Sequence, residues 1–102
     1  MTLRLSRADI ARGPALDRID RHYSRLVAEE IGPLGALHAL KRAQAIAGGG
    51  PLLDGDAAAV LDRATAQDER LAGLDRARRA MKSAVRAATT SAEINEIVAR
   101  LG

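Results

Sequence analysis

The sequence contains no cysteine, tryptophan or phenylalanine, and its single aromatic residue is Tyr23. Without cysteine the chain has no disulfide, no thiolate nucleophile and no cysteine-ligated zinc site. Large aromatic side chains usually help to fill a globular core, whereas the apolar residues here, 47% of the chain, are mostly alanine and leucine. This composition favours closely packed helices over a globule with a deep ligand pocket.

Long apolar runs are also missing. No stretch approaches the ~18 apolar residues that a membrane-spanning helix needs. The first residues, MTLRLSRADIARGPAL, carry arginines where a secretory signal would need an apolar run. We therefore expect a protein made in the cytoplasm that has no membrane partner.

The charge balance is only weakly basic. Sixteen lysines and arginines face thirteen aspartates and glutamates, which gives a net charge of +3. Charges of both signs are well mixed along the chain, as is usual for the solvated surface of helices. A dedicated nucleic-acid module usually carries a larger basic excess.

Glycine and proline divide the chain into four segments with helical periodicity. We expect helices at 14–31, 34–47, 56–88 and 91–101, with Pro14 in the first turn of the first helix. The segments GPLG (32–35) and GGGPLLDGD (48–56) interrupt the pattern. Residues 1–13 are predicted to be an N-terminal arm and 14–102 a single helical domain. The predicted fold class is all-α: a small antiparallel helical hairpin or bundle with one long helix and a short C-terminal helix.

Two helix starts carry capping signals. Asp54 or Asp56 is placed to cap the long helix, because an aspartate oxygen can accept from the free amides of the first turn. Thr90 and Glu93 match the S/T-x-x-E capping box, in which the hydroxyl binds the amide of the glutamate and the glutamate reaches back. The first signal marks the start of the long helix, and the second marks the boundary between the long helix and the short last helix.

The long helix has a row of positions at alternating steps of four and three residues. Seven of the nine positions are apolar, and Gln67 and Arg78 interrupt them. The nine positions, which we call the seam, are Val60, Ala64, Gln67, Leu71, Leu74, Arg78, Met81, Val85 and Ala88. The row predicts the seam of a coiled coil or antiparallel hairpin. The two polar residues lie either where the partner helix is short or where they set register or oligomeric state. The predicted helix-packing interface comprises Leu26, Leu37, Leu40, Leu71, Leu74, Met81 and Val85, and Leu37, Leu40 and Ile46 form the expected apolar stripe of the second helix.

No catalytic, metal or cofactor site is predicted. His22 and His38 are sixteen residues apart, without the spacing of a metal pair. The Asp-Gly-Asp of 54–56 lacks the further oxygen ligands of a calcium loop. The GGGP segment lacks the Lys-Ser/Thr that follows a phosphate-binding loop. We therefore expect a protein that is not an enzyme and has no small-molecule substrate.

A basic run in the second half of the long helix is the remaining candidate site. At 100° per residue, Arg79, Lys82 and Arg86 line one flank of the seam. The flank could hold phosphates, but no aromatic residues are interleaved for base stacking. The expected role is a solvated flank, or ion pairs with Glu29, Glu30, Glu93 or Glu96. The candidate phosphate contacts are Arg76, Arg78, Arg79, Lys82 and Arg86.

Two long segments give the chain a resemblance to a known helical region. They are IDRHYSRLVAEEIGPLGALHALKRAQAIAGGGPLLDGDAAAVLDRA and LDRARRAMKSAVRAATTSAEINEI. Between residues 19 and 98 the chain resembles a helical region of tail-fibre-associated proteins of tailed phages and prophages. The matching positions are Ile19, Asp20, Gly32, Pro33, Lys41, Ala45, Pro51 to Leu53, Arg79, Lys82, Val85, Ala87 to Thr90 and Ala92 to Ile94.

The resemblance implies a structural, tail-associated component that acts through helix packing and is incorporated into a virion or phage-like particle. Its expected partners are other particle components or further copies of the chain. Two alternatives stay open. One is a small DNA-binding oligomer, such as a small-terminase-like packaging subunit that uses the basic flank. The other is a helical regulator, or antitoxin-like partner, of another protein.

Overall fold

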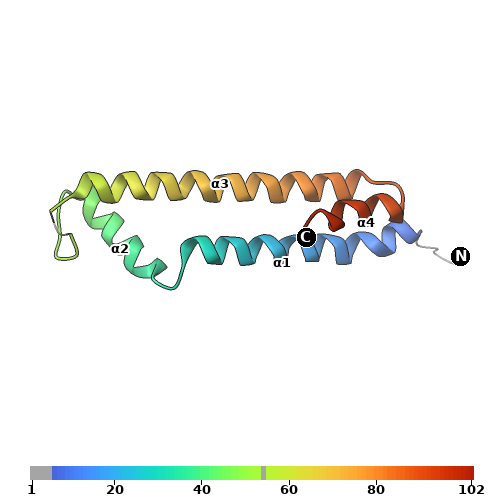
Figure 1. Ribbon diagram of the computed structural model, residues 1–102, viewed down its shortest axis with the longest axis horizontal. Helices are drawn as coiled ribbons and strands as arrows, with labels where there is room; N and C mark the ends of the chain where they lie inside the picture. The colour runs from blue at the N-terminus through green and yellow to red at the C-terminus, as the bar shows by residue number, and fades with distance from the viewer. Residues whose placement is uncertain (1–5, 54) are drawn as a thin grey trace, which may run out of the picture. The chain divides into compact units, whose positions relative to one another are not determined.

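A computed structural model describes residues 6–53 and 55–102, and these residues form an all-α fold. The helices are α1 (Arg7–Ile31), α2 (Gly35–Ile46), α3 (Ala57–Ala87) and α4 (Ser91–Ala99) (Figure 1). The all-α prediction is confirmed, as are the long third helix and the short last helix. The bounds of α2 and α3 lie within one residue of the predicted ones at each end.

The chain forms two compact units. Unit 1 combines the chain up to Leu26 with Leu74–Gly102, and unit 2 is Val27–Gly73. Both α1 and α3 contribute turns to each unit, whereas α4 belongs to unit 1 and α2 to unit 2.

Helix α1 begins at Arg7, seven residues before the predicted start. Residues 7–13, expected in the N-terminal arm, are therefore helical, and residues 1–5 lie outside the described residues. The start is a capping box: the Asp9 amide donates to Ser6 Oγ over 3.1 Å, and the Ser6 amide donates to Asp9 Oδ2 over 3.3 Å. This Ser-x-x-Asp signal is visible in the sequence, but the prediction missed it and placed the helix start at Pro14.

Pro14 lies inside α1 and does not start it. An interior proline removes one backbone hydrogen bond and costs roughly 3 kcal/mol. Packing offsets this cost, because Ala8 and Ala15, on either side of Pro14, are both buried. The helix ends at Ile31 and is followed by Gly32, whose φ of 73° lies in the left-handed region that favours glycine.

The main core lies in unit 1, where α1, α3 and α4 meet. Ile19, Val85 and Ile94, one from each helix, are the largest fully buried side chains. Alanines and the apolar residues of α4 complete this cluster: Ala8, Ala15, Ala88, Ile97 and Val98. The small alanines let the helices approach closely, as the composition suggested.

Arg12 joins α1 to the C-terminal end of α3. Its Nε donates to the Val85 carbonyl over 3.3 Å and its Nη2 to the Ala88 carbonyl over 2.8 Å. Asp9 holds the same guanidinium through Nη1 at 2.7 Å. The last carbonyls of a helix have no partner within it, so Arg12 acts as a side-chain cap from a neighbouring helix.

The start of α4 confirms Thr90 as its cap residue. The Glu93 amide donates to Thr90 Oγ1 over 3.1 Å. The Glu93 carboxylate reaches back to the Thr89 amide at 3.2 Å, one residue earlier than the capping box predicts. The expected reciprocal cap is therefore present with its second hydrogen bond shifted by one residue.

In unit 2, Gln44 organises the glycine-rich loop after α2. Its Oε1 accepts from the Leu52 amide over 2.8 Å, and its side chain occupies the space that a Cβ on Gly50 would need. Asp56 caps α3, because its Oδ1 accepts from the Ala59 amide over 3.0 Å. Asp54, the other candidate cap, lies outside the described residues.

Among the described residues, no helix is long and apolar enough to cross a membrane.

Candidate functional site

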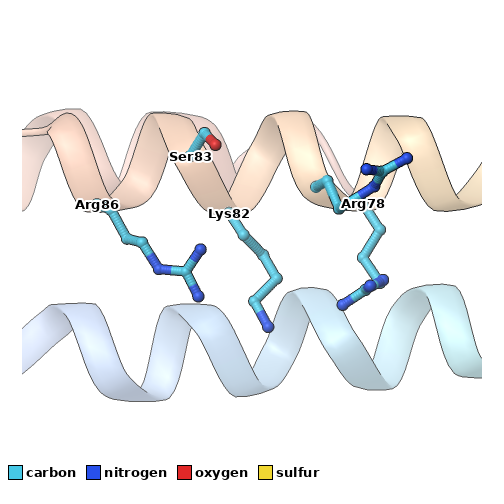
Figure 2. A pocket seen from close by; sticks show the side chains of 5 residues that line it. Arg78, Lys82, Ser83 and Arg86 are labelled. Carbon is cyan, nitrogen blue, oxygen red and sulfur yellow. The ribbon is translucent and has the colours of Figure 1, made fainter.

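The predicted basic flank forms a shallow groove on the unit 1 part of α3. Arg78, Arg79, Lys82, Ser83 and Arg86 line a space of about 280 Å³. Lys82 and Arg86 extend from α3 toward neighbouring turns of α1, whereas Ser83 points away from them (Figure 2). The structure thus brings together four of the five candidate phosphate contacts. The fifth, Arg76, is exposed and lies outside the groove lining.

Two aspartates pair with the groove cations. Asp20 of α1 accepts from Arg78 Nη1 at 3.0 Å and from Lys82 Nζ at 2.8 Å. Asp75 of α3 accepts from Arg78 Nη2 at 2.9 Å and from Arg79 Nε at 3.0 Å. Ion pairing was expected with Glu29, Glu30, Glu93 or Glu96, but the carboxylates on this flank are Asp20 and Asp75.

These contacts shift the pKa values of the groups that make them. The hydrogen bond from Lys82, followed by that from Arg78, lowers the pKa of Asp20 below its ordinary value. The hydrogen bond from Arg78 is the main cause of the lowered pKa of Asp75. The same bonds raise the pKa of Arg78. Because each shift favours the charged form, the pairs are fully ionised near neutral pH.

Positive charge exceeds negative charge around the groove. Three of the four groove cations share two carboxylates, and the fourth, Arg86, forms no ion pair with the described residues. The Arg79 side chain is 65% exposed, and its pair with Asp75 lies four residues away on the same helix. Exposed ion pairs of this kind contribute little to folding stability, so the arginine can readily leave its partner for another anion. Arg79 and Arg86 are therefore the groove cations most free to meet a ligand.

Most residues of the predicted packing interface are at least partly removed from solvent. Val85 is fully buried, and five others are half-buried: Leu26, Leu37, Leu71, Leu74 and Met81. The exception is Leu40, which is 57% exposed. Ile46, expected on the same apolar stripe, is 70% exposed. The stripe prediction was wrong for Leu40 and Ile46, because the less exposed side of α2 carries Leu37, Lys41, Gln44 and Ala45.

The two polar residues in the α3 seam both find partners on α1. Gln67 Nε2 donates to the Glu30 carbonyl over 3.1 Å in unit 2. In unit 1, Arg78 donates to Asp20. A polar group at a packing position costs least when a partner satisfies it. These pairs favour the interpretation that the polar residues specify register over the one in which they lie beyond the partner helix.

The outward face of α2 is a feature that the sequence interpretation missed. At 100° per residue, six exposed apolar residues fall within an arc of about 120°, and the charged residues of α2 lie outside it. They are Ala36, Ala39, Leu40, Ala43, Ile46 and the C-cap residue Ala47. We call this set the α2 face. The alternation of alanines with Leu40 and Ile46 could have revealed it, but both large residues were assigned to the inward stripe.

No group of three or more His, Asp or Glu side chains comes together as a metal site in 6–53 and 55–102. His22 packs edge-on against the neighbouring Tyr23 ring, with centroids 5.0 Å apart. The Tyr23 hydroxyl contacts Met81 Sδ at 3.3 Å. Tyr23 therefore contributes to the α1–α3 contact of unit 1.

Comparison with known proteins finds no matching family model, no similar curated protein and no similar solved structure.

Proposed function

We propose that this chain is a non-enzymatic structural subunit that binds another protein through the α2 face. The observation that carries the proposal is the exposure of Leu40 and Ile46 on a helix face without charge. Single exposed apolar residues are ordinary, but a continuous uncharged face is typical of an interaction surface.

The side chains on this face suit a helical partner. Burial of a Leu or Ile side chain contributes about 1.5–3 kcal/mol relative to exposure. Ala36, Ala39 and Ala43 add little bulk, so the backbone of a partner helix can approach closely. Leu40 and Ile46 then flank the contact on either side of the alanines.

The sparse core of unit 2 supports the same proposal. Of the described residues in Val27–Gly73, only Ala45 is buried, while Ile31, Leu34, Leu40 and Ile46 are large exposed apolar residues. Unit 1, by contrast, holds every other buried residue of the core. A partner on the α2 face would remove from water the apolar surface that unit 2 leaves exposed.

The proposed setting is the tail of a phage- or prophage-like particle. This part of the proposal rests on the resemblance of residues 19–98 to a helical region of tail-fibre-associated proteins. An all-α chain whose described residues gather no metal-binding cluster suits a packing role in such a particle.

Particle fractionation of the strain that carries the gene tests both parts. The wild-type chain should sediment with tailed particles, and the variant Leu40→Glu/Ile46→Glu should remain in the soluble fraction. The variant should keep the melting temperature of the wild type, because both positions are exposed. Each lost apolar contact of about 1.4 kcal/mol weakens binding roughly tenfold.

Ile10→Glu is the matched control, since Ile10 is 61% exposed but lies on α1 in unit 1. It should sediment with the particles like the wild type. A wild-type chain that never sediments with particles would contradict the tail setting. A double variant that sediments normally would contradict the role of the α2 face.

A further inference from the structure

The groove on α3 holds more positive charge than its folding contacts use. Asp20 and Asp75 account for two of the four cationic charges that line it. Arg86 has no ion-pair partner among the described residues, and Arg79 holds only an exposed partner on its own helix. We propose that this groove binds the phosphate backbone of duplex DNA without reading its sequence.

The donors in the groove match phosphate oxygens. Arginine presents a planar fork of N–H donors that can bind two phosphate oxygens together. Lys82 supplies a compact charge that Asp20 holds at 2.8 Å, and Ser83 supplies a neutral hydroxyl donor. The lining contains no carboxylate side chain. The side chains that an anion contacts in the groove are therefore hydrogen-bond donors.

The length of the groove favours a polymer over a single phosphate ion. Arg79 and Arg86 are seven residues apart on one helix, which corresponds to about 10 Å along the helix axis. Two arginines at this separation can contact neighbouring phosphates of a nucleic-acid strand at the same time. The groove is also shallow, so it does not enclose a small ligand.

The lack of stacking residues favours a duplex over a single strand. Proteins that bind single strands usually stack bases on aromatic side chains. The only aromatic residue of this chain, Tyr23, is half-buried and contacts Met81. Backbone contacts alone give affinity that is independent of sequence and falls steeply with salt.

Anisotropy titrations with a labelled duplex of arbitrary sequence, from about 50 to 200 mM NaCl, test the proposal. The wild type should bind at low salt, and its salt slope should correspond to two or three phosphates. Arg79→Ala/Arg86→Ala should weaken binding at least tenfold at the lowest salt and lower the slope by about two. Both residues are exposed, so circular dichroism should show an intact fold.

Two further variants distinguish binding at the groove from attraction of DNA to the overall positive charge of the protein. Asp75→Asn removes one of the two carboxylates that neutralise the groove, so it should strengthen binding by several-fold. Arg63→Ala/Arg100→Ala removes the same charge as the first variant from exposed positions outside the groove and should leave binding nearly unchanged.

Three results would overturn the proposal. They are absence of salt-dependent duplex binding, equal weakening by the two double-arginine variants, and binding of inorganic phosphate or a single strand but not of duplex. None of these results tests the proposed binding of a protein to the α2 face, whose residues are on another helix.

Discussion

Arg78 on α3 donates to Asp20 on α1 at 3.0 Å, from a position in a mostly apolar packing seam. The same guanidinium donates to Asp75 at 2.9 Å and lines the basic groove. Arg78 therefore contributes to the register of α1 against α3 in unit 1 and to the charge of the groove. Its two carboxylate partners also make this part of the fold sensitive to acid.

Acid should weaken unit 1 through Asp20. Its folded pKa is lowered by Lys82 and Arg78 relative to an ordinary value of 3.8. Such a group stabilises the fold fully above its unfolded pKa, and the contribution is lost as pH falls through the lower folded pKa. Asp20→Asn should therefore lower the melting temperature at neutral pH. The difference from the wild type should shrink as the pH falls below the ordinary aspartate pKa of 3.8 and vanish once the folded carboxyl is protonated. An undiminished difference in acid would contradict the assignment.

The core of unit 1 should depend strongly on Ile19. This side chain is fully buried among residues of α1, α3 and α4, so Ile19→Ala should destabilise the protein by about 2–5 kcal/mol. A small domain with that loss can unfold entirely. Ile10→Ala on the same helix is the control, because Ile10 is 61% exposed and should change stability by less than about 0.5 kcal/mol. Urea unfolding followed by circular dichroism measures both, and similar losses in the two variants would contradict the described core.

Arg12 should hold the end of α3 beside α1. Arg12→Leu removes the donors to the Val85 and Ala88 carbonyls and should cost roughly 1.5–3 kcal/mol, the value of hydrogen bonds from a charged group. Arg18→Leu removes the same charge from an exposed position of α1 and should have little effect. Hydrogen exchange gives a second readout, since the last turn of α3 should exchange faster only in Arg12→Leu. Equal exchange in the two variants would contradict the cap.

The sequence predicted the helices and their order because helix periodicity and helix caps are local signals. All nine positions of the α3 seam are at least half-buried, including Gln67 and Arg78. The capping signals at Asp56 and Thr90 are confirmed for the same reason, since a side chain three residues from an amide needs no tertiary information.

The failures occurred where packing overrides local signals. Pro14 predicts a helix start, yet α1 continues through it because the alanines beside it are buried against other helices. Leu40 and Ile46 lie at the two edges of the α2 face, and their hydrophobicity alone could not show that this side of the helix is exposed. The ion-pair partners of the basic flank depended on the register of α1 against α3, which placed Asp20 rather than a glutamate beside Arg78.

The absence of native cysteine allows a direct test of the proposed α2 interface. Ala43→Cys places a single thiol at the centre of the α2 face, and Ala80→Cys places one on an exposed position of α3 in unit 1. The measurement is the rate of maleimide labelling in the isolated chain and in the purified particle fraction. The proposal predicts fast labelling of both thiols in the isolated chain and at least tenfold slower labelling of Ala43→Cys, but not Ala80→Cys, in particles. Equal labelling of Ala43→Cys in the two samples would contradict the claim that the α2 face binds a partner.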